Sequence, residues 1–364
     1  MKKATWIPLI IIIIGVCLAL AGFAAGGLKG FWIDRGGIHL ASAEQGNLVK
    51  VDENYAGFKD IELNVDFLDR ITFKEGDGYS VRGQNYERYG GLKVSLDGDK
   101  LNVEARRIGR WLNIGLDELF NLNVNDSWLE ITYPRGAHFG FVNANVSSGR
   151  VYVNGLDCDE LYVDDSFGKV DVSTITCDRL TIKAASGDTS LTGAEVKRSV
   201  SVSNDFGKVS LTDVNAETIS ASLSSGDAKI KNVTASVLKA AADFGKVELD
   251  SATADSMTLK LSAGNLSANE VRAGDLSVNS SFGKVSIDRL ELGGRCEIDC
   301  SSGDVSVSMN MSENDLSYEL NTNAGSVNVD GRRSSGSVYN RNSGALASLY
   351  AKADFGSINL RFLK

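Results

Sequence analysis

The sequence predicts an all-β protein, a single-stranded parallel β-solenoid or β-helix with coils of about 19 residues, preceded by one N-terminal transmembrane helix. Three observations support this prediction. A glycine-containing phrase recurs at an almost constant interval, and apolar residues alternate between successive glycines. A long apolar run also follows two lysines at the N-terminus.

The N-terminal run predicts a membrane anchor. Lys2 and Lys3 precede "WIPLIIIIIGVCLALAGFAAGG", and roughly 20 apolar residues span a bilayer as a helix. The lysines favour a cytoplasmic N-terminus, which makes residues 1–28 a single-pass anchor in the cell membrane and the rest of the chain extracytoplasmic. The alternative is a cleaved signal peptide, indicated by the small residues Ala19 and Ala21. Residues 29–48 are interpreted as a spacer.

Residues 141–310 carry the regular repeat. Its glycines lie 19 or 20 residues apart, with looser copies at Gly325 and Gly356. A unit of this length is too short for a strand–helix–strand crossover, and the pattern of leucine-rich repeats is absent. A solenoid remains, in which strands of successive coils stack about 4.8 Å apart. The regular glycines are Gly149, Gly168, Gly187, Gly207, Gly226, Gly245, Gly264, Gly283 and Gly303.

The repeat alternates between the spellings "FGK" and "SGD". Alternation of inward and outward side chains predicts that the phenylalanines point inward, so we expect Phe244→Ala to cost about 3 kcal/mol. Lysine and aspartate alternate one residue after the glycine, which predicts pairing of opposite charges on neighbouring strands. The residues assigned to the structural repeat are Phe167, Phe206, Phe244 and Phe282 with Gly168, Gly207, Gly245 and Gly283.

The two flanks of the repeat are also rich in strand-like segments. Residues 49–140 lack the 19-residue register, and we expect them to form opening coils or a small sheet over the first edge. Residues 106–128 interrupt this part and are a candidate for a short helix. Residues 311–364 drift out of register and are interpreted as the C-terminal cap.

Composition restricts the function. The net charge of −9 argues against a nucleic-acid partner, which requires a basic surface. Two histidines give little material for a histidine metal site or a Ser/His triad. Acids precede several glycine corners, where we favour turn formation over catalysis or calcium binding. We expect no cofactor. These acids are Asp164, Asp165, Asp205, Asp243 and Asp354.

Two groups of residues are candidates for specific chemistry. Cys158 and Cys177 lie one repeat apart, so they form either a disulfide or a buried pair of thiols. The stretch that combines basic and aromatic residues could contact anionic lipid, wall polymer or a partner protein, or could pack as part of the cap. It consists of Arg106, Arg107, Arg110 and Trp111.

The segments "FKDIELNVDFLDRITFKEGDGYSVRG" and "LEITYPRGAHFGFVNANVSSGRVYV", with the serial SSGD and SFGK phrases, resemble the bacterial putative adhesin domain family over roughly residues 49–360. The resemblance implies a β-solenoid in an extracytoplasmic location and supplies no catalytic residues. It favours a non-enzymatic envelope protein that binds an envelope protein or glycan. The alternatives are an accessory or sensory component of an envelope-stress system and a β-helix carbohydrate-active enzyme.

Overall fold

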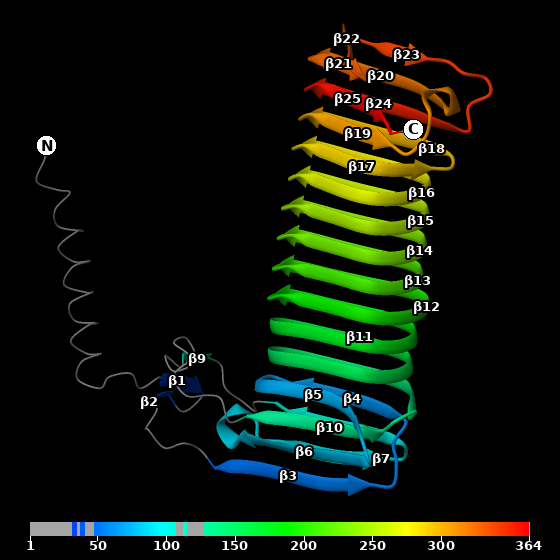
Figure 1. Ribbon diagram of the computed structural model, residues 1–364. Coiled ribbons are helices and arrows are strands. Elements are labelled where there is room, and N and C mark those ends of the chain that lie inside the picture. The colour runs from blue at the N-terminus through cyan, green and yellow to red at the C-terminus, as the bar shows by residue number, and fades with distance from the viewer. Residues whose placement is uncertain (1–30, 35–36, 41–46, 107–111, 115–126, 364) are drawn as a thin grey trace, which may run out of the picture.

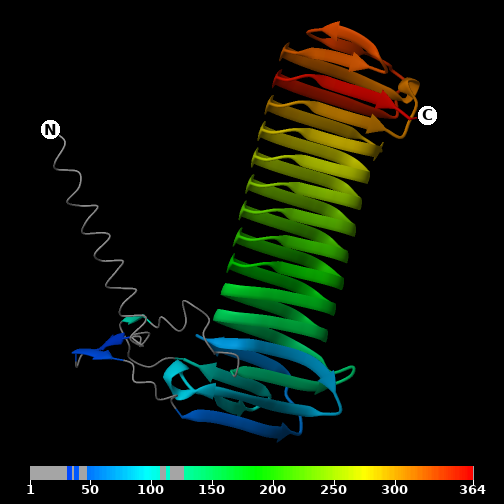
Figure 2. The same cartoon turned by 60° about the vertical axis from the view of Figure 1, so that its left-hand side comes forward.

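The computed structural model describes residues 31–34, 37–40, 47–106, 112–114 and 127–363 (Figure 1). Within these ranges, no helix has the length and apolar character needed to cross a membrane. The anchor expected over residues 1–28 lies outside the described residues. The described chain is all-β, and its parallel strands stack into a tall solenoid, as predicted (Figures 1 and 2).

The central coils follow the predicted period. Val209 pairs with Ala228, and Ala228 pairs with Val247, so these coils lie 19 residues apart, whereas Thr189 and Val209 pair at 20. The parallel hydrogen bonds continue from coil to coil, which gives each coil two neighbours and few free backbone groups. These strands are β11 (His138–Ser186), β12 (Thr189–Phe206), β13 (Val209–Ser225), β14 (Ala228–Phe244), β15 (Val247–Ala263) and β16 (Leu266–Phe282).

The core is a set of apolar columns that run along the solenoid. In one coil they are formed by Val209, Leu211, Val214, Ile219 and Ala221, all buried. The equivalent residues of the other coils are buried too, so these inward positions were predicted correctly from alternation. Burying a Val, Leu or Ile side chain contributes about 1.5–3 kcal/mol, and each added coil extends the same core.

The repeat glycines form one corner of every coil, where the chain has no space for a side chain. Gly226 has φ +138°, and a Cβ at this position would lie 1.8 Å from the carbonyl oxygen of Gly207. The same contact to the preceding corner occurs along the whole column. Glycine is therefore required both for the backbone conformation and for the close stacking of corners.

A second corner lies six residues after each repeat glycine from Gly149 to Gly283 and has left-handed backbone. Asn and Asp tolerate this conformation, whereas it strains a β-branched residue such as Thr174 (φ 56°). The stacked coils on both sides hold the strained backbone in place. The non-glycine residues of this corner are Thr174, Asp213, Asn232, Ser251, Glu270 and Arg289, with φ between 51° and 57°.

The N-terminal part supplies both opening coils and a covering sheet. β4 and β5 form a coil on which β11 stacks in parallel, and β8 and β10 lie below them in parallel. Three further strands cover the first edge through antiparallel pairs: β3 pairs with β6, β6 with β10, and β7 with β8. The bounds are β3 (Leu48–Tyr55), β4 (Asp60–Val65), β5 (Leu68–Gly76), β6 (Tyr79–Tyr86), the 3-10 helix η1 (Glu87–Tyr89), β7 (Lys93–Asp97), β8 (Lys100–Ala105) and β10 (Trp128–Pro134).

Three short strands form a separate antiparallel sheet. They are β1 (Phe31–Asp34), β2 (Gly37–Leu40) and β9 (Leu112–Ile114). The interval interpreted as a spacer therefore contributes two strands. The interval considered for a short helix contains a strand in its described part.

The C-terminal cap reverses the order of the last coils. β24 inserts between β18 and β20, and β25 inserts between β19 and β21, all in parallel. β22 and β23 then pair antiparallel with β21 and β20 and cover the outer edge (Figure 1). The bounds are β17 (Val285–Leu292), β18 (Arg295–Ser302), β19 (Val305–Met309), η2 (Glu313–Asp315), β20 (Leu316–Ala324), β21 (Ser326–Val329), β22 (Arg332–Ser335), β23 (Val338–Asn340), β24 (Ala347–Phe355) and β25 (Ile358–Phe362).

We predict that Gly226→Ala lowers the free energy of unfolding by at least about 3 kcal/mol, because the new Cβ overlaps the Gly207 carbonyl oxygen. Gly98→Ala is the matched control: Gly98 also has positive φ (+60°) but nothing within 4 Å of the added Cβ. Thermal unfolding followed by circular dichroism measures both. Equal losses in the two variants would show that corner stacking is not what requires glycine.

Candidate binding surfaces

The phenylalanines of the repeat are exposed, which corrects the inward orientation predicted from alternation. Phe167, Phe206, Phe244 and Phe282 are 63–64% exposed, and Phe355 at the equivalent corner of the cap is 68% exposed. The expected cost of about 3 kcal/mol for Phe244→Ala, which assumed a buried ring, is therefore wrong.

The reason lies at the glycine corner, where alternation breaks earlier than expected. Asn204 is buried, but Asp205 and Phe206 both point outward before the chain turns at Gly207. The inside of the corner is already occupied, because Asn204 Nδ2 donates a hydrogen bond to the Gly187 carbonyl at 2.7 Å. With the glycines stacked in contact, no volume remains inside for an aromatic ring.

The exposed rings form a column that alternates with small residues. The column holds one residue per coil, so neighbouring rings are two coils, or about 10 Å, apart. The ends of β12–β16 mark this column and lie one above another in Figure 1. The paired residues, in spatial order, are Ser186, Phe206, Ser225, Phe244, Ala263, Phe282, Ser302, Phe355 and Ala324.

In space, phenylalanine and small residues continue to alternate at the point where their order along the chain would interrupt the pattern. Ala324 precedes Phe355 in the sequence, so chain order would place two small residues, Ser302 and Ala324, next to each other. Because β24 inserts between β18 and β20, Phe355 pairs with Ser302 on one side and Ala324 on the other. On the surface, phenylalanine therefore occurs in every second coil even where the order along the chain does not follow this period.

The aspartates of the "SGD" spelling bind backbone groups of the next coil. Their side-chain oxygens accept hydrogen bonds from backbone N–H groups at 2.8–3.0 Å. This explains the alternation more directly than ion pairing between neighbouring strands, because Lys246 forms its ion pair with Glu248 of its own coil. The acceptors and donors are Asp188 with Lys208, Asp227 with Lys246, Asn265 with Lys284, and Asp304 with Ser357.

The acids before the corners also have local partners. Each accepts a hydrogen bond from a neighbouring hydroxyl or amide, at 2.7–3.2 Å. Among the described residues, no group of three or more His, Cys, Asp or Glu side chains could hold a metal ion. The pairs are Asp164 with Tyr162, Asp205 with Ser224, Asp243 with Ser262, and Asp354 with Asn323.

Asp165 differs from the other acids because it is fully buried. Neither carboxyl oxygen has a hydrogen-bond partner. Burial raises the pKa of Asp165 to about 7, with a further increase from Asp164, whereas the nearby N–H of Phe167 opposes the shift. Residues at the same position donate to a glycine carbonyl, as Asn204 and Thr322 do. A protonated Asp165 carboxyl is the form suited to this position.

Cys158 and Cys177 are free, buried thiols, and the disulfide that we considered is not formed in the structure. Their mutual hydrogen bond and their burial raise the pKa of the Cys158 thiol far above its ordinary value. A thiol with a raised pKa holds little thiolate and reacts slowly. The pair therefore fills an apolar column as a core element.

Of the proposed contact stretch, only Arg106 lies in a described range. Its guanidinium donates to Asn64 Oδ1 at 2.9 Å, beside a shallow depression of about 390 Å³ that Asp66, Asn145 and Asp164 also line. Arg107, Arg110 and Trp111 lie outside the described residues. Arg106 is thus tied to an opening coil, and contact of this stretch with lipid or a partner stays a prediction.

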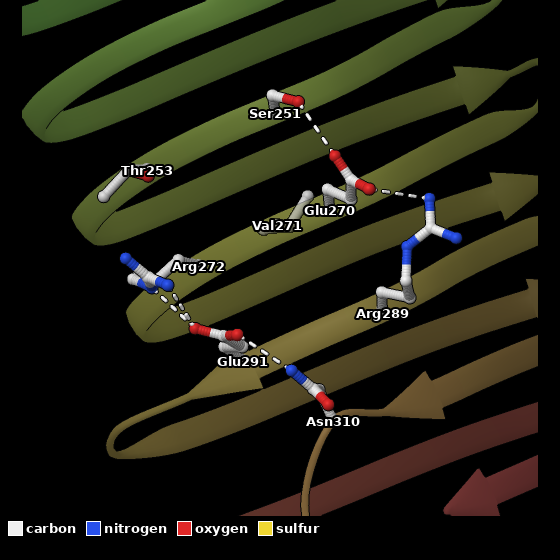
Figure 3. Close-up of a pocket in the computed structure, with 8 residues that line it drawn as sticks. All are labelled: Ser251, Thr253, Glu270, Val271, Arg272, Arg289, Glu291 and Asn310. Atoms are coloured by element: carbon white, nitrogen blue, oxygen red, sulfur yellow. Dashed lines mark hydrogen bonds and ion pairs between the residues drawn. The ribbon is translucent and has the colours of Figure 1, made fainter. Parts of the chain in front are cut away.

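A second depression, of about 350 Å³, lies along the left-handed corner (Figure 3). Glu270 accepts from Ser251 Oγ at 3.2 Å and forms an ion pair with Arg289 at 3.0 Å. Glu291 pairs with Arg272 at 2.6 Å, and Asn310 donates to it at 2.8 Å. Each charged group in Figure 3 has a partner in a neighbouring coil, so these charges link coils.

We predict that Phe244→Ala changes the free energy of unfolding by no more than about 0.5 kcal/mol, because an exposed side chain away from structural contacts contributes little. Leu238→Ala, at a fully buried position of the same strand, is the positive control and loses about 2–5 kcal/mol. Urea unfolding, carried out at the same protein concentration for both variants, gives the two free energies of unfolding. A large loss for Phe244→Ala alone would place the ring inside.

We predict that the protein becomes less stable as pH rises from 5 to 8. The buried Asp165 carboxyl has a pKa of about 7 in the folded protein, against an ordinary value of 3.8, so the unfolded chain loses this proton at lower pH than the folded protein does. Asp165→Asn removes up to about 3 kcal/mol of this loss. Its melting temperature exceeds that of the wild type by several degrees at pH 8 and by little at pH 5.

His138 adds a dependence of the same sign, since its hydrogen bond to Asp157 raises its pKa, but this contribution is shared by wild type and variant. The difference between the two proteins therefore isolates Asp165. A difference in melting temperature that does not change with pH would contradict a titrating buried carboxyl.

Comparison with known proteins identifies the family. Among curated proteins, none matches this chain. Crystal structures of a "putative adhesin" from Bacteroides fragilis and a "putative lipid binding protein" from Parabacteroides distasonis are similar to 87% and 88% of this chain, and 97% and 98% of theirs. Their identities are 11% and 12% and their TM-scores 0.33 and 0.32, which carry no information about ligands. The model of the Toastrack DUF4097 family matches residues 58–214 and 194–361, so the chain belongs to the Toastrack DUF4097 family.

Proposed function

We propose that the chain is a membrane-anchored, extracytoplasmic binding protein of the cell envelope, an adhesin-like module without enzymatic activity. The observation that supports this proposal best is the column of five exposed phenylalanines. A regular row of large, exposed apolar side chains is unusual on a soluble surface and marks an interaction site. Phe167, Phe206, Phe244, Phe282 and Phe355 form this row, the phenylalanine column.

The solenoid gives the column a rigid support. Continuous parallel pairing and stacked glycine corners fix each ring's backbone relative to the next. A preformed surface of this kind loses little conformational entropy when it binds, which favours affinity for a large partner. The regular arrangement of such rings suits an extended macromolecular surface better than a small substrate.

The charged groups support binding over catalysis. Catalytic acids have perturbed pKa values and face a pocket that admits substrate. The acids at the glycine corners instead bind neighbouring hydroxyl, amide or backbone N–H groups. Asp165, whose pKa is strongly raised, is buried inside the coil. Lys2, Lys3 and the apolar run after them support the membrane anchor.

The test displays the full chain on bacterial cells and compares wild type with Phe206→Ser/Phe244→Ser/Phe282→Ser. Adherence is measured to isolated cell-wall glycan, to envelope membranes with their proteins, and to cells that display the same chain. We expect the variant to lose at least about tenfold in adherence to one of these surfaces.

Tyr339→Ser/Leu346→Ser is the matched control, because both side chains are at least 70% exposed and lie outside the column. Protease accessibility of a C-terminal tag on intact cells verifies equal outward display. Equal adherence of wild type, variant and empty cells on all three surfaces would overturn the proposed function.

A further inference from the structure

We propose that the phenylalanine column is a self-association surface on which a second copy of this chain docks in antiparallel orientation. This names the partner of the surface in the proposed function and rests on the same column. Ten positions of this column, from Phe167 to Ala324, are here called rungs 1 to 10, and Ser148 continues the alternation below rung 1. In spatial order they are Phe167, Ser186, Phe206, Ser225, Phe244, Ala263, Phe282, Ser302, Phe355 and Ala324.

The order of the rungs makes the column complementary to itself. Odd rungs carry phenylalanine and even rungs carry serine or alanine. Two parallel columns related by a two-fold axis face each other rung by rung and bring phenylalanine against phenylalanine. Two antiparallel columns, related by a two-fold axis between rungs 5 and 6, bring every phenylalanine opposite a small residue. A two-fold interface requires this kind of self-complementary surface.

The spacing allows the rings to interlock. Rings of one column are two coils, or about 10 Å, apart. A ring of the partner that enters this gap lies about 5 Å from the ring on each side, within the 4.5–7 Å separation that aromatic pairs favour. The insertion of Phe355 between Ser302 and Ala324 extends this spacing into the cap, where chain order alone would end it.

The charged column beside the rings is complementary in the same orientation. Lys208 on rung 3 faces Asp304 of the second copy on rung 8, and Asp227 on rung 4 faces Lys284 on rung 7. Asp227 and Asp304 each use Oδ1 for a backbone N–H, so the carboxylate is fixed in position. Only the antiparallel orientation makes this column face itself, because a parallel two-fold pairing brings it opposite the column that precedes the rings.

The acids on the other side of the rings avoid each other in this orientation. Asp205 on rung 3 faces Ser301, and Asp243 on rung 5 faces Ser262. Asp354 on rung 9 faces Ala185. The ring column and the two columns beside it therefore match in side-chain size and charge in the same antiparallel register. A glycan or an unrelated protein gives no reason for this internal symmetry.

The apolar area is sufficient for an interface. Ten rings, five from each copy, are each about two-thirds exposed, and together they offer on the order of 1,000 Å² of apolar surface. With the flanking charged columns, the contact reaches the range of about 1,200–2,000 Å² that is typical of stable complexes. The antiparallel pair places the two β3 ends far apart (Figure 1), a geometry that joins two surfaces if the chains are anchored as proposed.

The experiment uses the full chain in detergent micelles and sedimentation velocity over a concentration series. We expect the wild type to dimerise and Phe206→Ser/Phe244→Ser/Phe282→Ser to raise the dimer Kd by at least about tenfold. Tyr339→Ser/Leu346→Ser leaves the Kd unchanged. A wild type that stays monomeric at all concentrations, or a variant that dimerises equally well, would overturn self-association.

A second pair of variants tests the register. Ser225→Phe fills the gap that receives Phe282 of the second copy, so it should weaken dimerisation at least about tenfold. Adding Phe282→Ser to Ser225→Phe moves ring and gap together and should restore it. Ser302→Phe with Phe206→Ser repeats the test on rungs 8 and 3, should the first pair fail to fold.

Stronger dimerisation of Ser225→Phe would contradict the antiparallel register, because a parallel pairing brings rung 4 against rung 4. If the wild type is monomeric but the three-serine variant still loses adherence to wall glycan or envelope proteins, the proposed binding function stands and the second copy is not the partner. If adherence is also unchanged, both proposals fail.

Discussion

The close stacking of the glycine corners is the constraint on which the rest of the structure depends. At these corners the carbonyl oxygen of one glycine occupies the place where the Cβ of the next would lie, as Gly207 does beneath Gly226. Such contact is possible only if every coil turns at the same point, so it aligns the corners of coils that have 19 or 20 residues. It also leaves no interior volume at the corner, and the phenylalanine beside each glycine lies outside.

Polar side chains form hydrogen bonds with backbone N–H and C=O groups at the glycine corners. Aspartate or asparagine after the glycine accepts the backbone N–H of the following coil. A polar residue three positions before the glycine donates to a glycine carbonyl, as Asn204 does. The alternate spellings therefore satisfy backbone groups across the corner. Asp165 is the exception, because its carboxyl can donate only when it is protonated.

The exposed phenylalanines are not required by this internal arrangement. Serine and alanine occupy the same place in alternate coils with the same backbone pairing. A ring that contributes nothing to the core, yet recurs in alternate coils and continues through the inserted coil at Phe355, is best explained by contact with something outside the chain. The column thus connects the fold to the binding function that we propose.

The sequence by itself determined the all-β solenoid, its 19-residue coil and the apolar columns of the core. These features follow from local alternation and from the spacing of residues such as Gly226 and Gly245, both of which are visible along one chain. The direction of Phe244 could not be read in the same way, because alternation breaks inside a corner whose volume depends on the neighbouring coil. The burial of Asp165 without a partner likewise depends on what fills the corner around it.

The position of the last coil was also decided by tertiary structure alone. Nothing local in residues 347–362 indicates that they pair with the coil at 295–309 before the coil at 316–329 does. Parallel strands of similar apolar pattern compete for the same edge, and the choice between them depends on long-range packing. That choice brings Phe355 next to Ser302 and completes the alternating column.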